Sequence, residues 1–375
     1  MQFKNVGIAS MGTCLPSEIW SSEELERRLE PVYRRLRLPA GRLALMSGIE
    51  QRRVWPAGTL PSGPSIQSGQ AALAAAGIDP SEVGCLVHAS VCRDFLEPAT
   101  ASKVHHGLGL SPQCWVYDVS NACLGLLNGL VQIAQLIEAG SIQAGLVVGT
   151  ENSRPLLEQT IAHLNADQSL TRQTIKPAFA SLTIGSGSCA ILLADCNRTP
   201  NASGLTTAVA RANTQHHDLC CSHEDKAGAA MNPLMDTDSQ RLLEAGVATG
   251  AATFADFLAA SHWQREQIDR SVCHQVGHRH RELILAAMGI PVQRDVATFA
   301  WLGNTGSVAL PLTLAAACQW GLIRAGQRVG LFGIGSGINS VMLGCQWAET
   351  PIAGNLPEQE PRFSTNPEDA LLSHP

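Results

Sequence analysis

The chain lacks an excess of positive charge, a long apolar run and any paired-cysteine pattern. Its 26 lysines and arginines against 32 aspartates and glutamates give a formal net charge of −6, so no overall field attracts nucleic acid. No apolar run reaches the roughly 18 residues that a transmembrane helix needs, and the N-terminus lacks a secretory leader. The 12 cysteines form no CxxC pair, which favours reduced, buried thiols. These absences predict a cytoplasmic chain that binds no nucleic acid and does not insert into membranes.

Short apolar runs alternate along the chain with helical patterns. With 375 residues, 45% of them hydrophobic, the chain can bury two cores or one large pseudo-symmetric domain. The predicted buried strands are residues 85–90, 115–120, 146–149, 190–194, 329–332 and 340–343. The clearest predicted helices are residues 68–76, 124–139, 249–260 and 308–323. Alternation of this kind predicts an α/β fold with helices on both faces of the sheet.

Two segments share one plan, which indicates an internal duplication. Residues 126–152 and 310–336 each read as a helix, an Ala-Gly turn, a buried strand and a polar loop. We therefore expect an N-terminal half over residues 1–195 and a C-terminal half over residues 196–349. Residues 154–176 and 213–239 are polar and are predicted as irregular excursions. Residues 350–375, rich in proline and glutamate, are predicted to form a mobile tail.

Cys123 is a candidate nucleophile because of its place in DVSNACLGLLNGL. It follows a predicted strand and begins a long apolar helix, where the helix dipole and unpaired N–H groups favour thiolate. A lone cysteine at such a turn is more often a small buried apolar residue. Position alone therefore leaves both interpretations open.

His274 and Asn304 stand at similar junctions. His274 ends a short apolar run in SVCHQVG, and Asn304 lies between glycines in WLGNTGSVALP, before another apolar helix. Taken singly, each is typical of a structural histidine and of a turn residue. Together with Cys123, they mark the ends of elements where open α/β sheets assemble sites.

The segments DVSNACLG, HQVG and GNTGSVALP, in this order, resemble the Cys, His and Asn motifs of thiolase-superfamily condensing enzymes, especially 3-oxoacyl-ACP synthase III. The resemblance covers residues 1–347. It implies the thiolase-like duplicated αβαβα five-layered fold and an acyl-enzyme intermediate on Cys123. It also implies that a neutral His274 and Asn304 donate hydrogen bonds to the enolate of a second substrate. The chain departs from the family's HQAN motif, because Gly277 replaces the asparagine.

Two further segments resemble substrate-contacting parts of the same family. GIGSG resembles its C-terminal Gly-rich loop, which implies that backbone N–H groups of Cys123 and Ser336 hold the oxyanion. GIEQRRVW resembles the segment near the coenzyme A entrance, which makes Arg52, Arg53 and Trp55 the substrate-binding candidates. They belong to a set of arginines that meets phosphates or forms a solvated helix face: 27, 28, 34, 35, 37, 42, 52 and 53.

SVCRDFLEPATASKVHHGLGL resembles the SxSRDxLEPS stretch of OleA-type enzymes, which join two long-chain acyl-CoA molecules head to head. In those enzymes the glutamate of this stretch reaches the neighbouring subunit's active site and is the proposed base, and the matching residue here is Glu97. Without the resemblance, Glu97-Pro98 is typical of a helix start. The resemblance implies a homodimer that uses coenzyme A thioesters as substrates and needs no cofactor.

Other readings stay open at this point. A decarboxylative synthase III would condense acyl-CoA with malonyl-ACP and need no protein base, and an acyl carrier protein would then be the partner. A non-catalytic partner subunit would be expected to lack one of the three motif residues, and a papain-like protease would have a different sequence around its cysteine. A metal site is suggested by a cluster whose spacing matches no zinc template: His216, His217, Cys220, Cys221 and His223. His274, His278 and His280 likewise lack the acid of HExxH, and no metal is expected.

Overall fold

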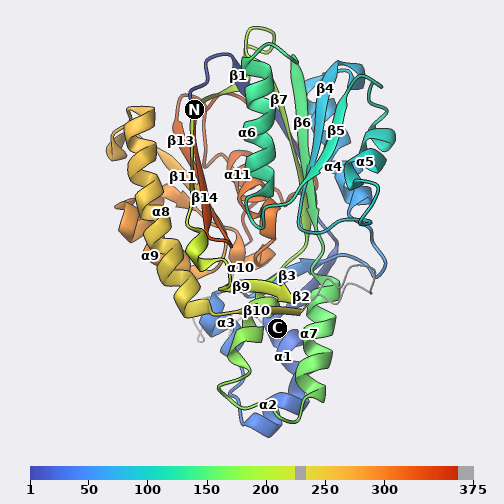
Figure 1. Ribbon diagram of the computed structural model, residues 1–375, viewed down its shortest axis with the longest axis vertical. Helices are drawn as coiled ribbons and strands as arrows, with labels where there is room; N and C mark the ends of the chain where they lie inside the picture. Colours follow the sequence, from blue (N-terminus) through green and yellow to red (C-terminus); the bar gives the residue numbers. More distant parts are fainter. Residues whose placement is uncertain (224–233, 362–375) are drawn as a thin grey trace, which may run out of the picture.

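The computed structural model describes residues 1–223 and 234–361. A mixed sheet of 11 strands runs through this part of the chain in the order β12-β11-β13-β14-β8-β1-β7-β6-β4-β5, with β15 beside β1 (Figure 1). In chain order the strands are β1 (Val6–Cys14), β4 (Val83–Ala89), β5 (Trp115–Val119), β6 (Ala144–Glu151), β7 (Gly187–Asp195), β8 (Ser203–Ala212), β11 (Arg270–Cys273), β12 (Asp295–Val296), β13 (Arg328–Gly335), β14 (Asn339–Gln346) and β15 (Ile352–Gly354).

The two halves of the sheet have the same topology. In the first half β1 pairs antiparallel with β7, β7 antiparallel with β6, and β6, β4 and β5 run parallel. In the second half β8, β14, β13, β11 and β12 repeat these directions in the same order. Two residue pairs between β1 and β8 join the halves. The duplication expected from the two similar segments is therefore present, since they form α6–β6 and α11–β13.

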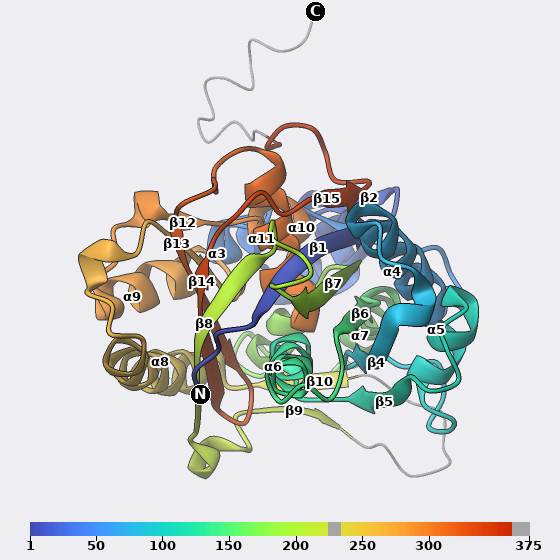
Figure 2. The same cartoon turned by 90° about the horizontal axis from the view of Figure 1, so that it is seen from above.

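Helices occupy both faces of each half-sheet. Seen from above, two helices lie between the halves and the other four cover the outer faces (Figure 2): α6 (Gly125–Glu138) and α11 (Ala309–Gln319) inside, and α4 (Ser62–Ala76), α5 (Thr100–Leu108), α8 (Ser239–Ser261) and α9 (His278–Met288) outside. The central core packs α6 and α11 against strands of both halves, and two further cores lie under the outer helices. The predicted five-layered αβαβα fold is confirmed.

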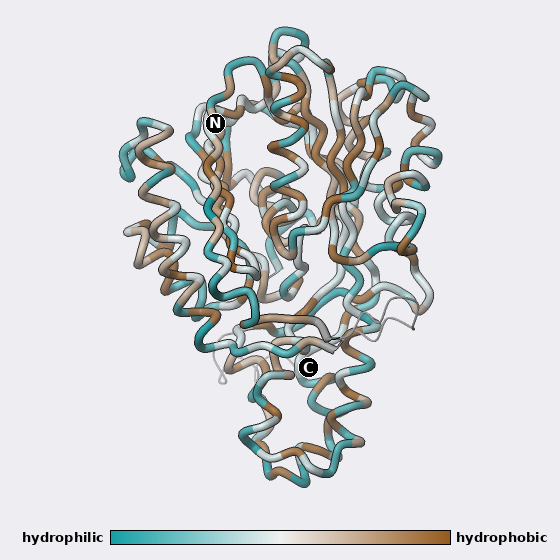
Figure 3. The backbone as a smooth tube through the Cα atoms, in the orientation of Figure 1, coloured by the Kyte–Doolittle hydropathy of each residue, from teal (hydrophilic) through white to brown (hydrophobic). Residues whose placement is uncertain are grey.

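Apolar residues at helical spacing explain the central layer. Leu126, Leu130, Ile133 and Ile137 of α6 are all buried, and apolar, brown segments run along the strands of the sheet (Figure 3). The predicted helix end at Gly77 is confirmed, because this glycine adopts a left-handed conformation and closes α4. Burial on two faces fits the near-continuous apolar runs of the strands.

By length and composition alone α8 could cross a membrane. It instead packs one face on the second half-sheet, where Phe254 and Phe257 lie edge-on to Phe332 with centroids 5.3 and 5.4 Å apart. Its exposed positions include Ala248, Ala255 and Asp256, and Asp256 pairs with Arg211 on β8. We interpret α8 as a core helix.

A small subdomain, called the cap below, lies under the carboxyl ends of the parallel strands (Figure 1). It consists of β2 (Glu18–Ser21), β3 (Gln51–Val54), α1 (Ser22–Arg28), α2 (Glu30–Leu36), α3 (Arg42–Ser47) and α7 (Arg154–Ala166), with the 3-10 helix η2 (Lys176–Thr183). These elements share a separate apolar core. The hairpin of β9 (Cys220–His223) and β10 (Leu234–Thr237) packs on η2, and α10 (Phe299–Leu302) packs on β3.

Two organisational predictions need correction. Residues 154–166 of the first predicted excursion are not irregular, because they form α7, which buries Leu157, Thr160 and Leu164 at helical spacing, while residues 167–175 have no helix or strand. The predicted tail does not begin at residue 350, since β15 pairs parallel with β1 and Asn355 exchanges hydrogen bonds with the backbone of Leu15. This segment is thus docked on β1 and, through Gln319 and Trp320, on the end of α11, while residues 362–375 lie outside the described part.

Candidate active site

Cys123 lies between the end of β5 and the first residue of α6. The connection is tight, and Ala122, the residue before Cys123, has a φ of 44. The Gly-rich turn after β13 packs directly against it: a Cβ on Gly335 would lie 3.5 Å from both the backbone nitrogen and the Cβ of Cys123. The same Cβ would lie 3.1 Å from the Cγ of Leu124, a tight contact that favours glycine here, and Ser336 is the next residue in sequence. The oxyanion role of the Cys123 and Ser336 N–H groups stays a prediction.

The predicted thiolate character of Cys123 needs correction. The pKa of its thiol is raised to about 12, mainly by burial and then by the charges of Glu151 and Cys220, while its own backbone N–H acts to lower it. Desolvation thus outweighs the favourable helix terminus. The resting site holds a neutral thiol, which must lose its proton as it attacks a substrate.

His274 follows β11 and is buried. Its backbone N–H donates to the carbonyl of Phe332 on β13, 3.1 Å away, which ties it to the strand that also contacts Cys123. Burial, and then the neighbouring His280, lower the pKa of His274 to about 3. In the described part of the chain its Nδ1 has no hydrogen-bond partner. The imidazole is therefore neutral near pH 7, as its predicted role as a hydrogen-bond donor requires.

Asn304 lies in the loop between α10 and the 3-10 helix η6 (Gly306–Val308). Its backbone bonds to Thr183 and Gly185 on both sides, at 2.9 Å each. Its Oδ1 accepts from the N–H of Gly306 at 3.0 Å. Since a backbone N–H can only donate, the amide is oriented and its Nδ2 faces the opposite side as a donor.

Glu151, at the end of β6, is a site residue that the sequence analysis missed. Its side chain is buried and accepts hydrogen bonds from two loops, one starting after β4 and one following Asn304. The same Ser307 hydroxyl lies 3.1 Å from the carbonyl oxygen of Ala89. The signal in the sequence was that Glu151 is an ionisable residue at the end of β6, whose other residues are apolar or small. Through these contacts the end of β6 connects the end of β4 and the loop after it with the segment that follows Asn304.

Glu97 does not lie in this cluster. It is exposed on the loop between β4 and α5, with Phe95 and Leu96 49% and 55% exposed beside it. The alternative reading as a helix start is wrong, because α5 begins at Thr100, where the carboxylate of Asp118 accepts the N–H groups of Thr100 and Ala101 at 2.8 Å. Within a single chain Glu97 faces solvent.

The predicted coenzyme A contacts need correction. Arg52 is 1% exposed and donates to Ser22 and to the carbonyls of Trp20 and Leu182, and burial lowers its pKa to about 10. Trp55 is buried and donates to the carbonyl of Glu151 at 3.0 Å. Arg53 is half-buried and donates to the carbonyl of Pro16. Arg52 and Trp55 therefore hold β3 in place and cannot meet a phosphate.

The other arginines of the N-terminal set are largely engaged within the cap. Arg27 and Arg28 pair with Glu24, and Arg34 pairs with Glu30, so the interpretation as a solvated helix face holds for these three.

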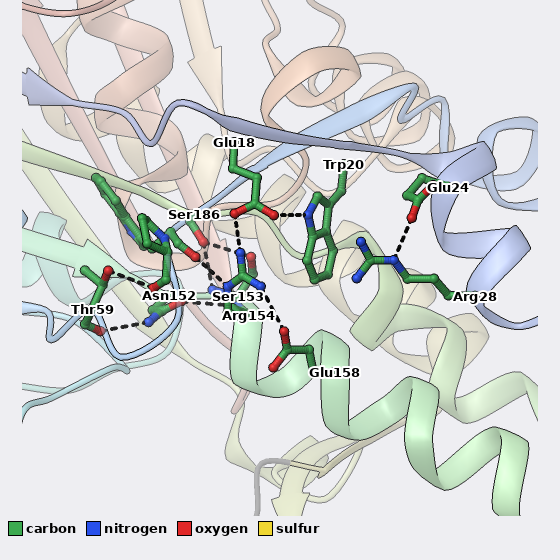
Figure 4. Close-up of polar contacts among 12 residues, drawn as sticks. Glu18, Trp20, Glu24, Arg28, Thr59, Asn152, Ser153, Arg154, Glu158 and Ser186 are labelled. Carbon is green, nitrogen blue, oxygen red and sulfur yellow. Dashed lines mark hydrogen bonds and ion pairs between the residues drawn. The ribbon is translucent and has the colours of Figure 1, made fainter.

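A network around Trp20 joins β2 to α7. Figure 4 shows Trp20 between Arg28 and Arg154, whose guanidinium carbons lie 3.8 and 4.9 Å from its ring centroid. Glu18 accepts from both Trp20 and Arg154. This network fixes the start of α7 on β2, next to the segment that follows Glu151.

The departure from HQAN has a steric cause. Gly277 has φ 155, and a Cβ there would lie 2.7 Å from the carbonyl oxygen of Ser47, at the end of α3. No other residue fits without moving α3 away from α9.

Replacement of Gly277 by asparagine is expected to lower the free energy of unfolding by about 1 to 3 kcal/mol, because the added side chain overlaps a backbone carbonyl. Urea denaturation measures the loss. Gly109→Asn is the matched control, since Gly109 also has a positive φ, of 65, but its Cβ position meets nothing within 4 Å. Equal losses in the two variants would contradict the steric explanation.

The metal alternative finds no support in the described part of the chain. No group of three or more His, Cys, Asp or Glu side chains there is arranged to hold a metal ion. That search includes His216, His217, Cys220 and Cys221 and the His274–His280 segment. The side chain of His223 is outside the described part.

Comparison with known proteins agrees with this geometry. A family model described as the N-terminal domain of thiolase matches residues 65–185, and one described as the C terminal of 3-oxoacyl-[acyl-carrier-protein (ACP)] synthase III matches residues 258–347. The acyl-CoA:acyl-CoA alkyltransferase of Shewanella oneidensis is 41% identical over 92% of this chain and 100% of that protein. The enzyme of the same name from Xanthomonas campestris pv. campestris is 33% identical over 92% and 100%.

Solved structures and more distant relatives complete the comparison. A structure of Xanthomonas campestris OleA matches with a TM-score of 0.87 at 32% identity, covering 92% of this chain and 98% of that one. A variant of that OleA with bound lauric acid and lauroyl-CoA matches with a TM-score of 0.86 over 92% and 100%. A beta-ketoacyl-[acyl-carrier-protein] synthase III of Streptomyces coelicolor is 28% identical over 88% of this chain and 94% of that protein.

Proposed function

The chain belongs to the acyl-CoA:acyl-CoA alkyltransferase (OleA) family of thiolase-fold condensing enzymes, and on this basis we propose that it joins two acyl-CoA molecules head to head through an acyl-Cys123 thioester. The observation that carries the proposal is the full-length match at 41% identity. The three motif residues on adjoining strand ends support it. The enzyme is an acyltransferase, and the substrates are coenzyme A thioesters.

In the first half-reaction the sulfur of Cys123 attacks the thioester carbon of one acyl-CoA. The bond from that carbon to the coenzyme A sulfur breaks, and the thiol proton of Cys123 leaves with the coenzyme A thiol. The developing oxyanion is held by the N–H groups of Cys123 and Ser336. The product of this step is the acyl-enzyme.

In the second half-reaction the α-carbon of another acyl-CoA becomes the nucleophile. A base removes its α-proton, and His274 and the Nδ2 of Asn304 donate to the thioester oxygen as enolate charge builds. The enolate attacks the acyl-Cys123 carbon, and the bond from that carbon to the Cys123 sulfur breaks. The leaving thiolate takes up the proton that the base removed, which restores the thiol of Cys123. A 2-alkyl-3-oxoacyl-CoA results, and hydrolysis of its thioester gives the 2-alkyl-3-oxo acid.

The base is the part of this mechanism that requires a partner subunit. Glu97 is exposed in the single chain, among the exposed side chains of Phe95, Leu96 and Val91. Contiguous apolar exposure is typical of an interface, and β5, with Trp115 61% exposed, is an edge strand of the sheet. A homodimer would place the Glu97 of one subunit in the other subunit's site. Light scattering tests the dimer.

The second candidate function is the decarboxylative synthase III reaction with malonyl-ACP. It is favoured by the C-terminal family model and by relatives of that name at 27–28% identity. Loss of CO₂ would create the enolate without a protein base, and an acyl carrier protein would deliver the second unit. The lower identity of these relatives makes this the weaker reading.

Product mass spectrometry separates the two functions. Pure protein is incubated with lauroyl-CoA alone, and in parallel with lauroyl-CoA and malonyl-ACP. We expect a 2-alkyl-3-oxo acid, or the ketone left after its decarboxylation, from lauroyl-CoA alone. A 3-oxoacyl-ACP that forms only with malonyl-ACP would contradict the proposal. We further expect the enzyme in the cytoplasm and without a cofactor.

A further inference from the structure

The carboxylate of Glu151 connects two loops that carry groups of the proposed mechanism. Its Oε1 accepts from the N–H of Val91 at 3.1 Å, and its Oε2 from the N–H of Cys92 at 3.3 Å. Its Oε1 also accepts from the N–H and hydroxyl of Ser307, at 3.3 and 2.5 Å. Four donors thus converge on this carboxylate, and both of its oxygens act as hydrogen-bond acceptors.

Each loop leads to a group that the reaction needs. Val91 and Cys92 begin the loop that reaches Glu97, and Ser307 lies three residues after Asn304. The backbone of Glu151 is itself fixed, because it pairs with Gly187 on β7 and its carbonyl accepts from Trp55. A rigid strand end thus holds both loops through one buried side chain.

We propose that Glu151 is a positioning residue, which holds the Asn304 loop of its own site and the loop that presents Glu97 to the partner subunit's site. This inference rests on the proposed function for the roles of Asn304 and Glu97. Its readout at the resting thiol of Cys123 does not, because alkylation needs no acyl-CoA.

The charge of Glu151 has a consequence for the nucleophile. After burial, it is the largest cause that raises the pKa of Cys123, ahead of Cys220, and it acts in the same direction on the pKa of Cys92. Besides these groups, the proposed mechanism places the neutral imidazole of His274 at the same site. The negative charge of Glu151 disfavours the free thiolate of Cys123, so we expect the resting thiol to resist oxidation and alkylation.

The test is the rate of alkylation of Cys123 by iodoacetamide as a function of pH, read by mass spectrometry on the peptide that contains this cysteine. In Glu151→Gln the charge is lost, so the pKa of Cys123 falls and the alkylation curve moves to lower pH. Each pH unit of this shift raises the rate at a fixed pH about threefold, because the tenfold gain in thiolate is partly offset by its lower nucleophilicity. The same variant is expected to lose condensation about tenfold or more.

Glu138→Gln is the matched control. Glu138 also accepts two backbone N–H groups and a side chain, from Lys4 and Asn5, but it ends α6 at the helix terminus opposite Cys123. We expect it to leave the Cys123 alkylation curve unchanged. A purely structural loss in Glu151→Gln would lower the melting temperature without moving this curve.

Ser307→Ala tests the positioning part and remains informative if Glu151→Gln fails to fold. It removes one hydrogen bond to Glu151 but keeps the charge, so condensation should fall several-fold while the alkylation curve of Cys123 stays in place. Unchanged alkylation in a folded Glu151→Gln, or unchanged condensation in both variants, would overturn the inference. Because alkylation needs no acyl-CoA, its result stands whichever condensation the enzyme performs.

Discussion

Replacement of Cys123 by alanine is expected to abolish transfer of acyl label from acyl-CoA to the protein, and with it all condensation. The reason is chemical: among the groups gathered at this end of the sheet, Cys123 is the thiol that the Gly335 turn and the start of α6 surround. Loss of a nucleophile removes the covalent route altogether, so we expect a fall of roughly a thousandfold or more. The measurement is incubation with acyl-labelled acyl-CoA, followed by peptide mapping.

The high pKa of Cys123 makes the serine variant informative as well. A hydroxyl in the same place is a weaker nucleophile than a thiol, so Cys123→Ser should bind acyl-CoA but acylate far more slowly. Cys196→Ala is the control, since Cys196 lies beyond the opposite end of β7 and its loss should leave labelling intact. Label that persists at another residue of the Cys123→Ala protein would refute the proposed intermediate.

The layered fold could be predicted from the sequence because its strands are buried on both faces. Apolar runs such as residues 146–149 and 190–194 fall inside β6 and β7, and the periodicity of α6 is that of a helix packed on two sides. The strand β15 could not be found in this way. Its pairing with β1 joins residues more than 300 positions apart, and nothing local in a proline-rich segment signals such a contact.

The candidate site was predictable only in part. Cys123, His274 and Asn304 were ambiguous one by one, and their order in three motifs made them candidates. Arg52 was assigned wrongly because the alternation of a strand was not applied to QRRV: in β3, Arg52 and Val54 point inward while Gln51 and Arg53 are half-buried. Glu151 belongs to no motif, and its importance follows from partners 60 and 156 residues away in sequence.

Replacement of Glu97 by glutamine is expected to leave acylation of Cys123 intact and to reduce condensation by about a hundredfold or more. Glutamine keeps the size of the side chain but cannot accept the α-proton, and loss of a general base costs this much in most enzymes. Acyl transfer to Cys123 and release of 2-alkyl-3-oxo acid are measured on the same sample. Glu358→Gln, which changes an exposed glutamate in the docked segment after β15, should change neither.

The exposure of Glu97 within its own chain allows a sharper test of where it acts. Two chains with different affinity tags, one Cys123→Ala and one Glu97→Gln, are co-expressed and the mixed dimer is purified through both tags. If Glu97 reaches across the interface, one of the two sites contains an intact Cys123 from one chain and an intact Glu97 from the other, so about half of the wild-type condensation activity returns. If Glu97 serves its own subunit, neither site is complete and the mixed dimer stays as inactive as the parents. Activity in the mixed dimer would thus establish both the base and the need for a second subunit, because each parent alone lacks one of the two groups.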